Sequence, residues 1–146
     1  MKKMLVVYYS WSNGNTKRIA EQLTNGTGAD IARIETTEPY SGSHEDVVEQ
    51  GKREVEAGFM PQINPISVNL ADYDVIAIGT PTWWYTMAPA VLTFLTVIKD
   101  MKDKCKGAAF AHEMQIQFDS MGKAHLETSE DVITEWIGQI KMEINK

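Results

Sequence analysis

The chain has 146 residues and a formal net charge of −6, from 14 lysines and arginines against 20 aspartates and glutamates. Its 43% hydrophobic and 23% charged residues are typical of a globular protein and exclude a disordered, collagenous or coiled-coil chain. The acidic balance argues against a nucleic-acid partner, and the single cysteine excludes a disulfide framework.

The chain is expected to form one domain over residues 1–146. Its length is usual for one domain, and it contains no repeat, low-complexity tract or linker. The apolar run at residues 4–9 follows two lysines but is too short for a signal peptide or a membrane span. We therefore expect a cytoplasmic protein without a membrane partner.

The first two thirds of the chain alternate between expected strands and helices. Apolar runs at residues 4–9 (MLVVYY) and 75–79 (VIAIG) predict strands that are buried on both faces, as in a parallel sheet. A helix is expected to begin near Thr16 and to be stopped by Gly26 and Gly28. Residues 30–35 predict a half-exposed edge strand, and residues 45–59 a second helix. This alternation indicates an α/β fold with parallel strands, in which ligands bind where the strands end.

The remaining third gives a less regular pattern. Pro89 suits the first turn of a helix, and apolar spacing predicts one long helix from Val91 to Cys105, with Cys105 facing the core. Residues 110–118 alternate between apolar and polar, which predicts an edge strand. Residues 128–144 predict a capped amphipathic helix that serves packing rather than chemistry.

The first buried strand leads into a loop with the properties of an anion cradle. Hydroxyls and amides supply donors, a glycine permits close approach of the backbone, and the following helix adds partial positive charge. The loop contains no cation and matches neither GxxxxGK[ST] nor GxGxxG, so it suits a phosphate monoester held without a metal. The alternative is an ordinary turn that ends in a threonine N-cap. The residues are Ser10, Trp11, Ser12, Asn13, Gly14, Asn15 and Thr16.

The second buried strand leads into a loop with three consecutive aromatic residues. Such residues are hard to bury together, and flat rings at a loop tip form a stacking platform for a planar ring. The alternative is that one tryptophan packs in the core and another contacts a partner. The candidate residues are Pro81, Thr82, Trp83, Trp84 and Tyr85.

The sequence gives no reason to expect a metal site. His44, His112 and His125 are scattered, with no cysteine or carboxylate at the spacing of metal ligands. The pair His112 and Glu113 does not continue into an HExxH motif.

Three segments together resemble the flavodoxins, especially the short flavodoxin-like proteins sometimes described as Trp-repressor-binding-like. They are LVVYYSWSNGNTKRIAEQL, the EPY region before the second helix, and DYDVIAIGTPTWWYTMAPAVLTFL. The resemblance covers residues 1–95 and extends to the final helix. It implies a doubly wound parallel sheet and a non-covalently bound flavin mononucleotide (FMN). Compared with the commoner Ser-x-Ser-Gly-Asn-Thr form, Asn13 is an extra residue. The implied phosphate loop maps onto Ser10, Ser12, Gly14, Asn15 and Thr16, and the aromatic loop onto residues 81–85.

The resemblance implies an electron-transfer flavoprotein that serves a redox partner protein or a small quinone-like acceptor. One alternative is an enzyme whose flavin takes a hydride from NAD(P)H and reduces a quinone. The other is a non-redox regulatory binding module that kept the fold.

The C-terminal part is too short for the five-stranded sheet of the family. Two helices, two strands and their connections need about 50 positions, more than lie between Pro89 and Glu127. We therefore predict a sheet of four strands that lacks the fourth strand of the family and the flavin-contacting loop after it. Residues 110–118 would lie against the Val75 strand or pair with a second chain in a homodimer. The competing interpretation makes residues 108–111 a short fourth strand. Without that loop one flavin face stays uncovered, which predicts weaker binding.

Overall fold

A parallel sheet lies at the centre of the computed structural model, which describes residues 2–11, 14–84, 86–98 and 130–145. Its strands are β1 (Met4–Tyr8), β2 (Asp30–Arg33) and β3 (Val75–Gly79), in the order β2-β1-β3. Both neighbours run parallel to β1. The predicted parallel α/β fold is confirmed. From β1 the chain first adds β2 on one side of the sheet and then adds β3 on the other side. The switch point of this doubly wound order therefore lies between β1 and β3.

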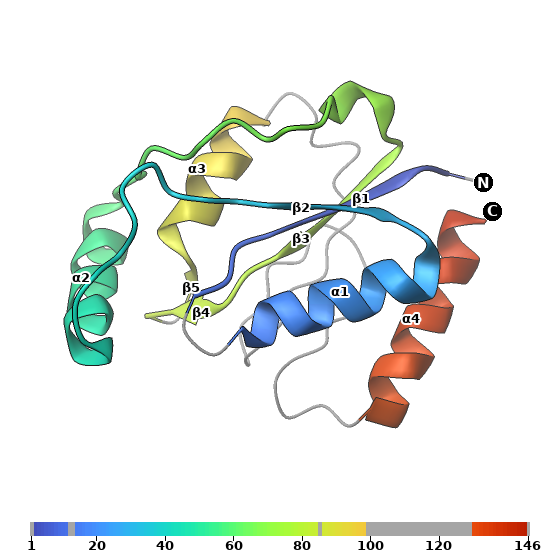
Figure 1. Cartoon of the computed structure of the whole chain (residues 1–146), viewed down its shortest axis with the longest axis horizontal. Coiled ribbons are helices and arrows are strands. Elements are labelled where there is room, and N and C mark those ends of the chain that lie inside the picture. Colours follow the sequence, from blue (N-terminus) through green and yellow to red (C-terminus); the bar gives the residue numbers. More distant parts are fainter. Residues whose placement is uncertain (1, 12–13, 85, 99–129, 146) are drawn as a thin grey trace.

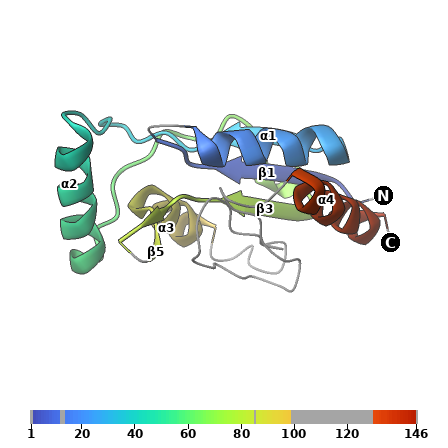
Figure 2. The same cartoon turned by 90° about the horizontal axis from the view of Figure 1, so that it is seen from below.

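Helices cover both faces of the sheet (Figure 2). On one face, α1 (Asn15–Thr27) and α4 (Glu130–Ile144) pack over Met4, Val6 and Tyr8. On the other face, α3 (Pro89–Val97) packs over Leu5 and Val7. Successive side chains of a strand point to opposite faces, so a strand covered on both sides must be apolar at every position. This explains the continuous apolar runs of β1 and β3.

The helix α2 (His44–Ala57) does not lie on the sheet. Figures 1 and 2 both show it beyond the end of the sheet, beside the short strands β4 (Thr82–Trp83) and β5 (Thr86–Met87). A capping box starts it: the backbone N–H of Asp46 donates to the Ser43 hydroxyl, and the N–H of Ser43 donates to the Asp46 carboxylate. After α2 the chain returns through a 3-10 turn, η1 (Leu70–Asp72), to β3.

Two helix ends differ from the sequence predictions. Gly26 lies inside α1, and Gly28, with φ 74°, is the residue that ends it. A glycine is needed at position 26 because a Cβ there would collide with Ile137 of α4. The predicted long helix to Cys105 is wrong at its middle, because α3 ends at Val97 and Ile98 is its C-cap.

The other predictions for this region lie outside the described residues. They concern Cys105, His112, His125, residues 108–111 and 110–118, and the cap of the last helix near Thr128. The sheet of four strands therefore stays a prediction. Within the parts that the structure does describe, no helix is long and apolar enough to span a membrane, and no three histidine, cysteine or carboxylate side chains gather as metal ligands would.

Candidate functional site

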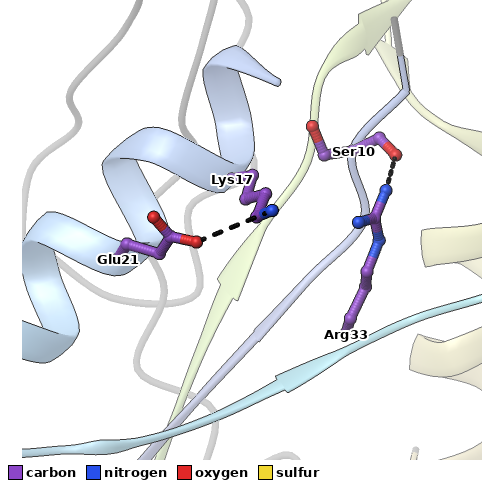
Figure 3. A network of polar contacts seen from close by, with 4 residues as sticks. All are labelled: Ser10, Lys17, Glu21 and Arg33. Atoms are coloured by element: carbon purple, nitrogen blue, oxygen red, sulfur yellow. Dashed lines mark hydrogen bonds and ion pairs between the residues drawn. The ribbon is translucent and has the colours of Figure 1, made fainter. Parts of the chain in front are cut away.

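The two predicted loops leave adjacent strands at the switch point of the sheet. The backbone N–H of Tyr9 donates to the Gly79 carbonyl at 3.0 Å, which continues the pairing of β1 with β3 by one residue. Ser10 follows and is buried. Its carbonyl accepts a 2.9 Å hydrogen bond from Nη2 of Arg33, which is shown in Figure 3. Arg33 therefore brings a cation to a loop whose own sequence has none.

The start of α1 is open to an anion. Gly14 is its N-cap with φ 72°, and no side chain among the described residues caps the helix. The alternative of a threonine N-cap is wrong, since Thr16 is the second helical residue and is buried. The first turn has no acidic residue, and a Cβ placed on Gly14 would meet nothing within 4 Å. Within the described part of the chain, the first backbone N–H groups of α1 thus have no side-chain acceptor, and the positive end of the helix stays open.

Lys17 and Arg33 both bring positive charge to this region. Lys17, in the first turn of α1, forms an exposed pair with Glu21 at 3.9 Å, and Figure 3 shows this pair with Ser10 and Arg33. An exposed pair of this kind contributes little to stability, so Lys17 is readily available to another anion. The Arg33 guanidinium also lies 5.9 Å from the ring centroid of Tyr8. Burial raises the pKa of Tyr8, while the nearby Arg33 opposes that rise.

The aromatic loop is a tight hairpin rather than an open loop. β4 and β5 are antiparallel, with Trp83 opposite Thr86, so the chain turns tightly just after Trp83. Such turns require left-handed backbone, and Trp84 has φ 46°. A bulky residue in that conformation stores about 1–3 kcal/mol of strain. At the base of the hairpin, the Thr80 hydroxyl accepts from the Ala88 N–H at 3.1 Å.

Trp83 points inward and is surrounded by aromatic rings. It makes edge contacts with Tyr9, Trp11 and Tyr40, at centroid distances of 5.8, 6.4 and 5.0 Å. It also packs on α2, because a Cβ on Gly51 would lie 3.0 Å from its Cε3 atom. Burial raises the pKa of Tyr9, so its hydroxyl stays protonated in this cluster. This position of Trp83 agrees with the alternative in which one tryptophan packs inside.

Trp84 has the opposite environment. It is 43% exposed at the tip of the hairpin, and Nζ of Lys52 lies 4.6 Å from its ring centroid. A lysine over an indole face is a favourable cation–π contact. Of the two described tryptophans in the hairpin, Trp84 is therefore the better placed to present a ring to a ligand.

The structure brings some of the predicted site residues together. Trp11 meets Trp83 and also stacks on His44 at 5.9 Å. Ser12, Asn13, Tyr85 and the side chain of Thr82 lie outside the described residues. Arg33 and Lys52 were not identified as candidate site residues from the sequence. Only the register of β2 against β1 places Arg33 here, whereas no local signal marks Lys52.

Comparisons with known proteins agree with this fold. A family model described as flavodoxin matches residues 3–143. NAD(P)H dehydrogenase (quinone) 3 of Rhizobium meliloti (strain 1021) is 36% identical over an alignment of 102 residues, which covers 65% of this chain and 43% of the relative. The match thus spans less than half the length of that relative.

Two solved structures have the same fold. One, described as a putative flavoprotein from Bacteroides eggerthii DSM 20697, has a TM-score of 0.74 and 25% identity, over 94% of this chain and 97% of that one. The other is a flavoprotein in complex with FMN from Lactobacillus acidophilus NCFM. It has a TM-score of 0.61 and 21% identity, over 95% of this chain and 88% of that one.

The contact of Trp83 with α2 predicts that Gly51→Ala destabilises the protein. Alanine in a helix interior usually gains about 1 kcal/mol over glycine. Here the new methyl group would press on a ring that three aromatic side chains hold in place. We expect a net loss of about 1–2 kcal/mol, measured by urea unfolding.

The matched control is Gly138→Ala in α4, where a Cβ would meet nothing within 4 Å. This variant should gain stability. If both variants gain equally, Trp83 is not wedged against α2.

Proposed function

This chain belongs to the flavodoxin family, and on that premise we propose that it binds FMN non-covalently and acts as an electron-transfer protein. The observation that carries the proposal is the start of α1. A left-handed Gly14 and the lack of a capping side chain or first-turn carboxylate, among the described residues, leave this helix end to an anion. It lies at the switch point between β1 and β3, where sheets of this type bind ligands.

The residues present fit the phosphate of FMN. Gly14, Asn15 and Thr16 would hold it through backbone N–H groups and the Thr16 hydroxyl. The space beyond Gly14 is open among the described residues, so none of them blocks the approach of a phosphate. Arg33 and Lys17 add local positive charge within a chain of net charge −6. This charge attracts the phosphate to one end of the sheet.

The hairpin fits the ring system. Trp84 would stack on the isoalloxazine, while Trp83 would support the hairpin from within. When bound, FMN supplies the electron transfer, and the protein orients the ring and sets its electrostatic surroundings. Lys52, held over Trp84, would place one positive charge near that ring. A nearby cation favours any form of a bound group that carries more negative charge.

A second candidate is an NAD(P)H-dependent quinone reductase. The 36% identity to NAD(P)H dehydrogenase (quinone) 3 favours it. That similarity covers 43% of the relative, so it supports a shared domain more strongly than a shared reaction. We therefore place the electron carrier first.

The phosphate assignment predicts that FMN binds at least about tenfold more tightly than riboflavin. A hydrogen bond to a charged group contributes about 1.5–3 kcal/mol. Thr16→Val removes the hydroxyl at nearly constant volume and should weaken FMN binding about tenfold, with little change for riboflavin. Fluorescence titration of each flavin measures both effects.

The control is Thr24→Val in the same helix, whose hydroxyl donates to the Ala20 carbonyl at 2.9 Å. This variant should bind FMN like the wild type. Equal affinity of the wild type for FMN and riboflavin would contradict the phosphate site. Failure to bind either flavin would favour the non-redox binding module.

The different environments of the two tryptophans predict different effects on bound flavin. Trp84→Ala should restore part of the quenched flavin fluorescence and weaken binding several-fold, because ring stacking contributes about 0.5–1.5 kcal/mol. Trp83→Phe should lower the unfolding midpoint while most of the quenching remains. The reverse pattern would place the stacking ring at Trp83.

The electron-carrier proposal predicts no enzymatic turnover with NAD(P)H. A mixture of FMN-loaded protein, benzoquinone and NADH or NADPH should oxidise the nucleotide no faster than the same mixture with free FMN in place of the protein. Saturable oxidation that depends on the protein would establish the quinone reductase instead.

A further inference from the structure

A pocket of about 500 Å³ lies beside α2, and none of the described residues that line it belongs to α1 or to the loop before α1. Its walls come from the loop before α2, from α2 itself and from the segment after α2. Figure 1 shows these two segments leaving opposite ends of α2 and running back toward the sheet. The volume is within the range of pockets that hold small molecules.

Hydrogen bonds between distant segments fix the walls of this pocket. Thr36 and Ile63 form an antiparallel bridge, and the Thr37 N–H donates to the Gln62 carbonyl at 2.9 Å. From α3, the Thr93 hydroxyl donates to the Pro61 carbonyl at 2.7 Å. The pocket is therefore formed by the fold itself and does not need a ligand to assemble it.

A buried carboxylate lines the pocket. Glu54 is only 8% exposed. The Tyr40 hydroxyl donates to its Oε1 at 2.6 Å, and the Gln50 amide donates to its Oε2 at 2.8 Å. Both oxygens of the Glu54 side chain are therefore hydrogen-bond acceptors. Burial and the hydrogen bond to Glu54 raise the pKa of Tyr40, which keeps the phenol protonated as the donor.

Among the residues that the structure describes, Glu54 has no cationic partner. The ion pair present in that part of the chain joins Lys17 to Glu21. Burial of a carboxylate costs free energy that two neutral donors offset only in part. The lining adds a second carboxyl group, Glu38, and includes no lysine, arginine or histidine. The two carboxyl groups therefore repel anions from the pocket. A positively charged group bound there would be attracted to Glu54.

Two aromatic rings complete the lining. The ring of Tyr40 forms part of the wall, and Phe59 is 50% exposed although it is large and apolar. Aromatic faces attract cations and also accept apolar groups. A carboxylate beside aromatic rings is the combination that suits an organic cation.

We propose that this pocket binds a small organic cation, with its ammonium group at Glu54 and its apolar part against Phe59. The pocket is distinct from the proposed FMN site, and the proposal does not require that FMN binds. Tyr40 contacts both Glu54 and Trp83, so indole fluorescence offers a direct signal of binding.

The test is a charge series on the wild-type chain, with benzylammonium, benzyl alcohol and benzoate. Calorimetry and indole fluorescence measure binding at millimolar concentrations. Benzylammonium should bind saturably and at least about tenfold more tightly than benzyl alcohol, and benzoate should not bind. Equal binding of the alcohol, or no saturable binding of benzylammonium, would overturn the proposal.

Two variants then assign the effect to Glu54. Glu54→Gln keeps a hydrogen-bond acceptor but removes the charge, and should weaken benzylammonium binding at least about tenfold. Glu56→Gln makes the same change on the exposed side of α2, outside the pocket lining, and should bind like the wild type. Equal losses in both variants would show a general effect of surface charge and overturn the site, and unchanged binding in Glu54→Gln would do the same. If Glu54→Gln fails to fold, the charge series decides alone.

Discussion

The packing of Trp83 on Gly51 holds α2 at the end of the sheet. A helix usually docks through an apolar stripe, but the buried residues of α2 are Val47, Gly51 and Glu54. They follow one another at helical spacing, so they form a stripe of one apolar residue, one glycine and one carboxylate. The glycine admits the indole ring, and the carboxylate binds Tyr40. Both the aromatic cluster and the pocket beside α2 depend on this arrangement.

The sequence predicts those parts of the fold whose cause is local. The strands β1 and β3 follow from their apolar runs, because burial on both faces leaves no polar position. The helix expected over residues 45–59 is α2, which spans His44–Ala57. Gly26 misleads because its reason is a contact with Ile137, which is distant in sequence. A glycine that ends a helix and one that admits another helix have the same appearance in the sequence.

The sequence also predicts the location of the candidate site, but not its detailed geometry. The two loops could be located because buried strands end in unusual residues. The hairpin could not, because its turn lacks the glycine or asparagine that normally marks left-handed backbone. Neighbouring residues of the hairpin have different surroundings, because Trp83 is partly buried against other aromatic rings while Trp84 is exposed. Arg33 reaches Ser10 through strand register, which follows from how strands pair and not from spacing along the chain.

Tyr40 is a common wall of two separate environments. Its ring packs on Trp83 toward the sheet, while its hydroxyl binds Glu54 toward the pocket. Any displacement of this one side chain changes both environments at once. Thermodynamic linkage then requires the free energy of coupling to be equal in both directions. A ligand that displaced Tyr40 from one side would change the affinity for a ligand on the other side, and the reverse effect would have the same factor.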